Sequence, residues 1–442
     1  MDLIVEPGRA LKGEIQVPGD KSISHRSIMC ASLASGVSTI SGFLESEDCL
    51  ATLKAFQSLG INIDRNRSLI KVQGKGLYGL KKPDKSLDLG NSGTSMRLIT
   101  GILAGQKFNS VLSGDESLLK RPMERITNPL NSMGYSIKAQ EDGTPPLEIF
   151  NVQKVSSINY ELPIASAQVK SCLMFASLFV EGESVIKENF RTRDHTERMF
   201  LKFAIPIHIS ELESTKLISI TPPKDIKPCD INVCGDFSSA SFFILAALIS
   251  PNSHVLIRNV GINSTRTGFL VALREMGANI TIKNPKNSFE PVADIEVKTS
   301  KLKGVTLDPK LVPNIIDELP SLFIASALAE GTTKIRGAKE LRYKESDRLE
   351  SMAQSLDKFG VTSKLVEDGI DIKGLDQSDL DKGPFDSGEI DSFGDHRVAM
   401  ASIMGALRSK GTCKIKNCEN ISTSFPGFIE LSNQLGLDVK KE

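Results

Sequence analysis

The chain has 442 residues, of which 40% are hydrophobic and 24% are charged, a composition typical of a soluble globular protein with more than one domain. Lys and Arg together number 54, as do Asp and Glu, and this zero net charge argues against a nucleic-acid-binding protein, which normally has a basic surplus. The sequence contains no apolar run of about 18 residues, so we expect no membrane-spanning helix.

Six times along the chain, a polar turn leads directly into an apolar segment rich in Ala and Ser, which we expect to be a helix. Asp, Asn and Ser side chains cap the backbone N–H groups at a helix start, and that end of a helix attracts anions. Successive starts lie 71, 75, 70, 81 and 78 residues apart, at Asp20, Asn91, Ser166, Asp236, Asp317 and Asp395. The first turns also contain cations, namely Lys21, Arg26, Arg97, Lys170 and Arg397. The repeat predicts a protein that binds small, multiply charged anions.

A second amphipathic helix and short β-rich segments follow each of these first helices. We expect the second helices at residues 46–60, 118–134, 193–204, 263–277, 345–360 and 424–436. Five of them end at Gly, the usual left-handed stop of a helix, whereas the third ends at Ala204. The pattern predicts an α/β fold of six βαβαββ units in two sets of three. The first strand, near Leu3, could belong to the second set, which would give two crossovers.

The richest polar motif is Pro18-Gly-Asp-Lys-Ser-Ile-Ser-His-Arg26. Lys21 and Arg26 supply positive charge and a rigid bidentate fork, and Ser22 adds a neutral donor. This combination suits a phosphate or a carboxylate. The alternative is a capped helix with solvated charges.

Two further signals in the first half are weaker alone. Gly93 lies in the turn that opens the predicted helix near Asn91, and it permits the backbone to approach a ligand closely. Arg121 precedes Pro122, which pushes it out of helical conformation. An ordinary turn and a surface arginine are the respective alternatives.

The second half places carboxylates beside cations. Lys344, Glu345 and Arg348 fall within one predicted helix start, where Glu345 between two cations suits acid–base chemistry. Asp317 and Asp395 stand at the starts of apolar helices near these cations, where proton transfer would explain them. A salt-bridged helix face and simple N-capping are the alternatives.

Four motifs in this order, PGDKSxSHR, LGNSGTxxR, RxKESDR and GDHRxAM, resemble those of the enolpyruvyl transferase family. The resemblance covers nearly the whole chain, from Pro18 to Phe428. It implies two inside-out α/β prism domains, each of three βαβαββ units, joined by two crossovers. The first domain would comprise residues 20–233 and the second residues 1–19 together with 234–442.

The resemblance is to the branch that transfers the enolpyruvyl group of phosphoenolpyruvate to the 5-hydroxyl of shikimate 3-phosphate by addition–elimination, releasing phosphate. This reaction belongs to the shikimate pathway, which leads to chorismate and the aromatic amino acids. The family's shikimate 3-phosphate ligands match Lys21, Ser22, Arg26, Ser166, Gln168, Asp317 and Lys344. Its phosphoenolpyruvate ligands match Lys21, Gly93, Arg121, Gln168, Arg348 and Arg397.

The family also implies roles for three catalytic residues. Asp317 matches the base that takes the proton from the substrate hydroxyl, and Glu345 matches the proton donor to the methylene carbon. Lys21 would touch both substrates. Such a reaction requires neither a metal nor another cofactor, and its partners are small molecules only.

Cysteine usage and the first residues bear on location. The seven cysteines, an odd number, lie mostly in apolar segments, which favours reduced thiols in the cytoplasm. The start of the sequence lacks the basic head and apolar run of a signal peptide. We expect a cytoplasmic protein without membrane or nucleic-acid partners, most simply a monomer.

Two other functions compete with this one. UDP-N-acetylglucosamine 1-carboxyvinyltransferase, a sister enzyme, typically uses a loop Cys, yet Glu116 and Ser117 stand in the corresponding loop here. A non-catalytic anion-binding protein of the same fold would not need both Asp317 and Glu345.

Two departures from the family pattern remain. Thr423 stands where some members have a Lys, and Lys410 or Lys416 could replace it. Several segments, among them Arg193-Asp-His-Thr-Glu197, resemble the class II subgroup, which favours reduced sensitivity to the inhibitor glyphosate. Gly93 points the other way, because it leaves the room for the inhibitor that sensitive members have.

Overall fold

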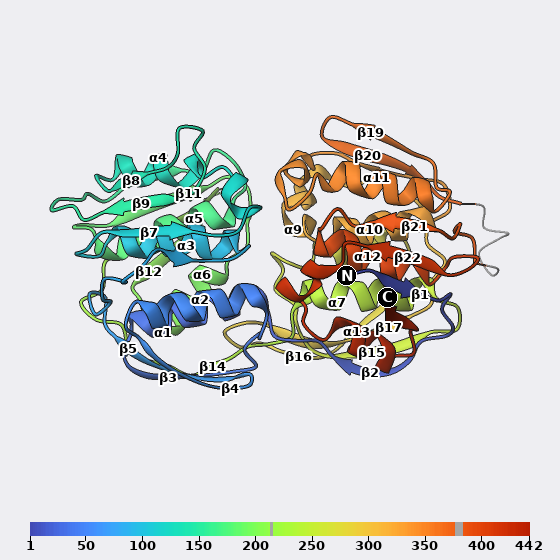
Figure 1. Ribbon diagram of the computed structural model, residues 1–442, viewed down its shortest axis with the longest axis horizontal. Coiled ribbons are helices and arrows are strands. Elements are labelled where there is room, and N and C mark those ends of the chain that lie inside the picture. Colours follow the sequence, from blue (N-terminus) through green and yellow to red (C-terminus); the bar gives the residue numbers. More distant parts are fainter. Residues whose placement is uncertain (213–214, 376–382) are drawn as a thin grey trace. The chain divides into compact units, whose positions relative to one another are not determined.

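The computed structural model describes residues 1–212, 215–375 and 383–442. Its contacts divide the chain into two compact units, which are coloured along the sequence in Figure 1. One unit is Gly19–Val233, and the other is Met1–Pro18 with Cys234–Glu442.

The unit Gly19–Val233 contains three four-stranded sheets and six α-helices within its described residues. Its helices are α1 (Lys21–Leu33), α2 (Glu47–Ser58), α3 (Gly93–Ala104), α4 (Glu124–Ser132), α5 (Ala167–Ala176) and α6 (His195–Lys202). The first sheet contains β14 (Ile231–Asn232), β3 (Ser35–Ser41), β5 (Leu69–Lys75) and β4 (Asn62–Asn66), in that order. The second contains β6 (Leu87–Asp88), β7 (Ser110–Ser113), β9 (Leu147–Phe150) and β8 (Ser136–Lys138). The third contains β10 (Asn159–Glu161), β11 (Ser184–Glu188), β13 (Thr215–Ile220) and β12 (Ile207–Leu212).

The other unit repeats this plan. Its helices are α7 (Phe237–Ile249), α8 (Gly268–Glu275), α9 (Val312–Ile315), α10 (Leu319–Ala327), α11 (Arg348–Lys358), α12 (His396–Ala406) and α13 (Phe428–Gln434). One sheet contains β16 (Asn279–Lys286), β17 (Val292–Lys298), β15 (His254–Gly261) and β2 (Lys12–Gln16). The next contains β18 (Thr332–Ile335), β20 (Gly369–Lys373) and β19 (Ser363–Val366). The last contains β21 (Glu389–Asp391), β22 (Cys413–Lys416), β1 (Leu3–Val5) and β23 (Val439–Lys441).

Five of the six sheets in the described part of the chain follow one pairing rule. In each of these, the strand after the first helix pairs antiparallel with the last strand of the repeat, which also pairs antiparallel with the strand after the second helix. In five sheets a further strand pairs in parallel at the edge, as β10 does with β11. Six sequence repeats thus give six equivalent sheets, and the predicted α/β fold of six βαβαββ units is confirmed.

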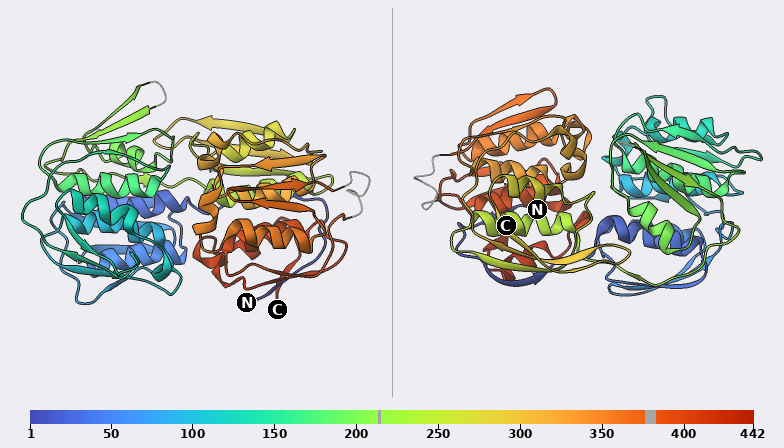
Figure 2. Two further views of the ribbon diagram at one scale, coloured as in Figure 1. Left: turned by 90° about the horizontal axis from the view of Figure 1, so that it is seen from above. Right: turned by 180° about the vertical axis from the view of Figure 1, so that it is seen from behind.

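Strand exchange produces two crossovers. β2 directly precedes α1 in the sequence but pairs in parallel with β15. β14 directly precedes α7 but pairs in parallel with β3. In addition, β1 takes the place of the last strand in the final sheet, between β22 and β23, so the two ends of the chain lie side by side (Figure 2).

The first helix of each repeat is largely buried, because small or apolar side chains occupy every face of the helix. Every residue of α7 is buried, including its Ser residues. Close packing explains one glycine: a Cβ on Gly101 of α3 would lie 2.2 Å from the carbonyl oxygen of Cys172 in α5. No helix in the described part of the chain combines the length and the apolarity needed to cross a membrane.

The second helices end alike in all six repeats. The residue after the left-handed position donates its N–H to the carbonyl five residues earlier, as Ile61 does to Phe56 and Val361 to Leu356. In five repeats the left-handed residue is the predicted Gly. In the third repeat Ala204 adopts this conformation, with φ +55°, and Ile205 donates to Phe200 at 2.8 Å. The backbone geometry of this stop is therefore kept where the sequence lacks its usual residue.

Candidate active site

Helix capping positions the first predicted motif. Asp20 accepts a hydrogen bond from the N–H of Ile23 at 2.8 Å and so fixes the start of α1. Lys21 and Ser22 therefore lie in the first turn, where the helix end favours anions. The Lys21 ammonium is ion-paired with Asp48 at the start of α2. In this structure the predicted substrate lysine is thus held by a carboxylate.

Arg26 lies one turn further along α1 and is only 4% exposed. Its Nε donates to Thr196 Oγ1 at 2.7 Å, its Nη2 to Ser171 Oγ at 2.9 Å, and its Nη1 to the carbonyl of Ser22 at 3.0 Å. Burial lowers the pKa of the guanidinium to about 10, which leaves it charged at neutral pH. Neutral groups of the described residues accept all three hydrogen bonds, so they hold the arginine without cancelling its positive charge.

A second group forms at the starts of α3 and α5. Arg97 Nη1 donates to Gln168 Oε1 at 2.7 Å, and Gln168 Nε2 donates to Thr94 Oγ1 at 3.1 Å. Arg121 Nη2 donates to Asn91 Oδ1 at 2.6 Å. These contacts bring the predicted Gln168 and Arg121 to the turn that also contains Gly93.

Gly93 lies directly beside both guanidinium groups. A Cβ at this position would lie 2.8 Å from Nη1 of Arg97 and 3.0 Å from Nη1 of Arg121. The absence of a side chain leaves room for both guanidinium groups. The structure thus brings Gly93, Arg121 and Gln168 together.

Lys170 differs from the prediction, which grouped it with the cations at the helix starts. Its ammonium is fully buried, 3.1 Å from Glu188 Oε1 and 2.8 Å from Glu197 Oε1. Burial opposes its charge, but the two carboxylates outweigh burial and raise its pKa above 10.5. Lys170 thus belongs to an internal ion cluster rather than to an anion site.

In the other unit, Arg348 is the centre of the predicted acid–base group. It is 1% exposed, at the start of α11. Its Nε lies 2.7 Å from Asp395 Oδ2, its Nη2 lies 2.6 Å from Glu345 Oε2, and its Nη1 lies 3.4 Å from Asp317 Oδ1. Burial opposes its charge, but these three carboxylates raise its pKa above the usual value. Two predicted catalytic carboxylates therefore share one cation.

Arg397 completes this group from the first turn of α12. Its Nη1 donates to the carbonyl of Asp317 at 3.0 Å, and its Nε lies 3.8 Å from the Asp317 carboxylate. Asp395 caps α12 by accepting from the N–H of Arg397 at 2.8 Å, so its N-capping alternative is correct, although it also binds Arg348.

One predicted helix start and one N-capping alternative are wrong in detail. α3 is capped by Ser92, which accepts from the N–H of Ser95, and not by Asn91. α10 begins at Leu319, and Asp317 does not cap it. Pro320 has no N–H to offer at the position that a cap at Asp317 would use. The Asp317 carboxylate instead contacts the two arginines.

The remaining predicted residues lie near these groups within their units. Ser166 caps α5 by accepting from the N–H of Val169 at 3.4 Å, two residues before Gln168. Lys344 is half-buried beside Glu345 in the chain. Sequence reasoning did not assign the neutral partners of the arginines, because a hydroxyl or an amide in a motif does not show which distant group it will bond. These partners are Asn91, Thr94, Ser171 and Thr196.

The lysines considered as replacements at Thr423 contact other groups. Thr423 is buried and donates its hydroxyl to the carbonyl of Asn420 at 2.7 Å. Lys410 lies 2.7 Å from Asp386, and Lys416 lies 3.5 Å from Glu389.

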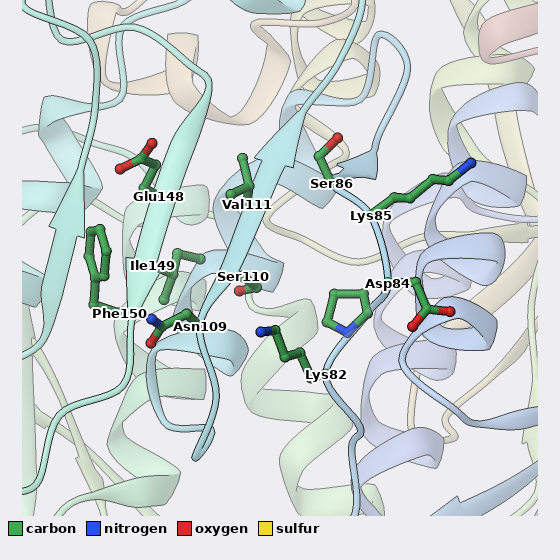
Figure 3. A pocket seen from close by; sticks show the side chains of 11 residues that line it. Lys82, Asp84, Lys85, Ser86, Asn109, Ser110, Val111, Glu148, Ile149 and Phe150 are labelled. Atoms are coloured by element: carbon green, nitrogen blue, oxygen red, sulfur yellow. The ribbon is translucent and has the colours of Figure 1, made fainter.

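A pocket of about 390 Å³ lies apart from these groups, between β7, β9 and the segment before β6 (Figure 3). Lys82 and Lys85 line it, but so do Asp84 and Glu148, so it has no clear preference for anions. Its lining includes none of the predicted site residues.

Comparisons with known proteins agree with the motifs. The family model of EPSP synthase, 3-phosphoshikimate 1-carboxyvinyltransferase, matches residues 5–431. The 3-phosphoshikimate 1-carboxyvinyltransferase of Methylococcus capsulatus is 48% identical over 98% of this chain and 97% of its own length. That of Hydrogenovibrio crunogenus is 49% identical over 98% of this chain and 97% of its own.

Solved structures show the same relationship. EPSP synthase from Acinetobacter baumannii superimposes with a TM-score of 0.87 at 45% identity, covering 100% of both chains. The enolpyruvyl transferase NikO from Streptomyces tendae shares the fold, with a TM-score of 0.78 at 15% identity over 99% of this chain and 98% of its own. Sequence and structure thus match over the full length, and the chain belongs to the EPSP synthase (3-phosphoshikimate 1-carboxyvinyltransferase) family.

Proposed function

We propose that this chain transfers the enolpyruvyl group of phosphoenolpyruvate to the 5-hydroxyl of shikimate 3-phosphate and releases phosphate. The family membership supports this activity. The observation that carries the mechanism is the pair of carboxylates, Asp317 and Glu345, on the single guanidinium of Arg348. The sister reaction on UDP-N-acetylglucosamine is not favoured, because the relatives at this level of identity are 3-phosphoshikimate 1-carboxyvinyltransferases.

Cations and helix starts would bind the anionic substrates. In the unit Gly19–Val233 we assign Lys21, Ser22, Arg26, Ser166 and Gln168 to shikimate 3-phosphate. Lys21, Gly93, Arg121 and Gln168 would bind phosphoenolpyruvate. Guanidinium groups suit this task because they remain charged and form bidentate hydrogen bonds with phosphate and carboxylate. Lys21 must exchange Asp48 for substrate oxygen atoms, and this exchange replaces one negative partner with another.

The other unit would supply further ligands. We assign Lys344 and Asp317 to shikimate 3-phosphate, and Arg348 and Arg397 to phosphoenolpyruvate. Arg348 already binds three carboxylates, so its positive charge also serves to place the acid and the base. Arg397 is the less enclosed of the two arginines, with 12% of its side chain exposed against 2% for Arg348.

The chemistry needs one proton delivered to carbon and one removed from oxygen. We assign Glu345 as the donor to the methylene carbon of phosphoenolpyruvate and Asp317 as the base for the 5-hydroxyl. The new C–O bond forms at the neighbouring carbon and gives a tetrahedral intermediate. In the elimination, the methyl group returns a proton to the Glu345 carboxylate, the C–O bond to phosphate breaks, and the double bond is restored. Lys21 and the arginines would stabilise the departing phosphate.

We also propose that the two compact units are the enzyme's two domains and that the protein acts as a cytoplasmic monomer, without a metal or other cofactor. The repeat of three βαβαββ units in each supports the domain division. Seven free thiols, most of them buried, are compatible with a reducing compartment.

A phosphate-release assay tests the proposed function. Purified protein with phosphoenolpyruvate should release phosphate when shikimate 3-phosphate is added and should not do so with UDP-N-acetylglucosamine. Release only with the nucleotide sugar would assign the sister reaction. Release with neither acceptor would support a non-catalytic anion-binding protein.

A further inference from the structure

Glu318, the neighbour of Asp317 in the chain, is a buried carboxylate without a role in the mechanism above. It is 1% exposed and stands immediately before α10. Its Oε1 accepts a short hydrogen bond from the hydroxyl of Ser238, at the start of α7. A buried carboxylate is costly unless it is paired, so its surroundings should explain why it is present.

Arg266 lies on the far side of Ser238 and is also buried, with 4% exposure. It donates to the Ser238 hydroxyl, and its Nη2 lies 3.6 Å from Glu318 Oε1 and 3.7 Å from Asp236 Oδ1. The turn before α8 positions it, because Arg266 donates its backbone N–H to the carbonyl of Asn263 at 2.8 Å. Asp236 and Glu318 therefore both face this guanidinium, so Glu318 is one of two carboxylates that compensate the buried positive charge of Arg266.

Arg397 lies near the same oxygen of Glu318. Its Nη1 is 4.0 Å from Glu318 Oε1, and its Nε is 3.8 Å from Asp317 Oδ1. Both separations are too long for hydrogen bonds, so the two carboxylates attract the guanidinium without using its N–H groups. Glu318 Oε1 thus lies within 4.0 Å of two guanidinium groups, the buried one of Arg266 and the partly exposed one of Arg397.

We infer that Glu318 is a positioning residue that acts through Arg397. The core cluster of Ser238 and Arg266 fixes the Glu318 carboxylate, and its negative charge holds the guanidinium of Arg397 in place for the carboxylate or phosphate of phosphoenolpyruvate. This inference rests on the proposed function, in which Arg397 binds that substrate. Glu318 itself touches no substrate.

The test compares Glu318→Gln with the wild type. Glutamine keeps the size of the side chain and an acceptor for Ser238 but removes the charge that attracts Arg397. We expect the KM for phosphoenolpyruvate to rise about tenfold and the KM for shikimate 3-phosphate to change less than about twofold, because only one substrate loses a positioned ligand. Glu188→Gln, which alters a buried carboxylate in the other unit, serves as the control for a general loss of stability.

A double-mutant cycle separates positioning from a merely structural role. In an Arg397→Gln background, Glu318→Gln should raise the KM for phosphoenolpyruvate no further, because the residue through which it acts is gone. If Glu318→Gln folds poorly, Ser238→Ala supplies the second variant. It loses one hydrogen bond to the carboxylate and should shift the same KM in the same direction by a smaller factor.

The outcomes are distinct. Equal rises in both KM values, effects that multiply with Arg397→Gln, or an unchanged KM for phosphoenolpyruvate in a folded variant would each overturn the inference while the proposed function stands. A wild-type protein that releases no phosphate with shikimate 3-phosphate would overturn the proposed function and the inference with it.

Discussion

Asp317 and Glu345 bind the same guanidinium group at unequal distances, 3.4 Å and 2.6 Å from the nearest nitrogen of Arg348. Asp317 also faces Arg397, 3.8 Å away, so the two carboxylates occupy different electrostatic surroundings. Such a difference is what allows two groups of the same kind to act as base and acid. The shared arginine also keeps them close together.

Asp317→Asn should retain substrate binding and lose most of its turnover. The amide keeps the size of the side chain but cannot accept the hydroxyl proton, and general-base catalysis contributes about 10²–10⁴-fold. Phosphate release measures kcat, and calorimetric titration with shikimate 3-phosphate measures binding. Wild-type turnover in the purified variant would contradict the assignment of Asp317 as the base.

Gly93→Ala should weaken phosphoenolpyruvate binding by displacing the ends of Arg97 and Arg121, which lie within 3.0 Å of the added Cβ. We expect a raised KM for phosphoenolpyruvate and a larger inhibition constant for glyphosate. Because several segments resemble the class II subgroup, we also predict that the inhibition constant of glyphosate for the wild type does not lie far below the KM for phosphoenolpyruvate. Competitive inhibition assays on both proteins check this, and an unchanged KM in the variant would show that the arginines move away at no cost.

Lys170→Met should destabilise the protein by about 3–5 kcal/mol, because it leaves Glu188 and Glu197 buried without their main cation. Denaturant unfolding measures the change. Lys339→Met, which removes the cation of the exposed pair with Glu367, is the matched control and should alter the free energy of unfolding little. A similar small change at Lys170 would mean that water or a rearrangement compensates the two carboxylates.

The same cluster predicts how stability depends on pH. Burial of Glu197 opposes its ionisation, but Lys170 and Lys216 outweigh burial and hold its pKa below 4.5. Its contribution is therefore present above pH 4.5 and is lost as the pH falls through the lowered pKa. Lys170, with its pKa raised above 10.5, contributes below that pH and loses its contribution as the pH rises further. In the double variant Lys170→Met/Glu197→Gln, the free energy of unfolding should fall less steeply as the pH drops below 4.5 than it does in the wild type. Denaturant unfolding at a series of pH values measures this.

Ala204→Gly should stabilise the protein by up to about 1 kcal/mol, because only Gly adopts the left-handed conformation without strain. Gly436→Ala is the matched control at the end of the sixth repeat. There φ is +105° and, apart from its neighbours in the chain, no atom of the described residues lies within 4 Å of the added Cβ, so backbone strain alone should lower the stability. Thermal unfolding measures both changes. Equal melting temperatures for Ala204→Gly and the wild type would show that the chain relieves this strain elsewhere.

The helices and their order could be predicted because each repeat has a polar start, an apolar body and a left-handed stop. The hydrogen bonds of the Arg26 guanidinium could not be predicted, because its partners Ser171 and Thr196 come from other helices and have no sequence signature. Lys170 was misleading for a related reason. A lysine near a helix start looks alike whether it faces an anion or a buried Glu on a distant strand, and only the fold decides which.

The place of β1 has a consequence for how this protein is made. Leu3 pairs with both Ile415 and Lys441, so β1 is made long before the two strands that flank it. During synthesis the unit Gly19–Val233 can close its sheets as soon as β14 has emerged. The other unit cannot complete its last sheet until β22 and β23 have emerged, and β1 stays exposed until then. Chaperone contact with the nascent chain should therefore last longest for this early strand.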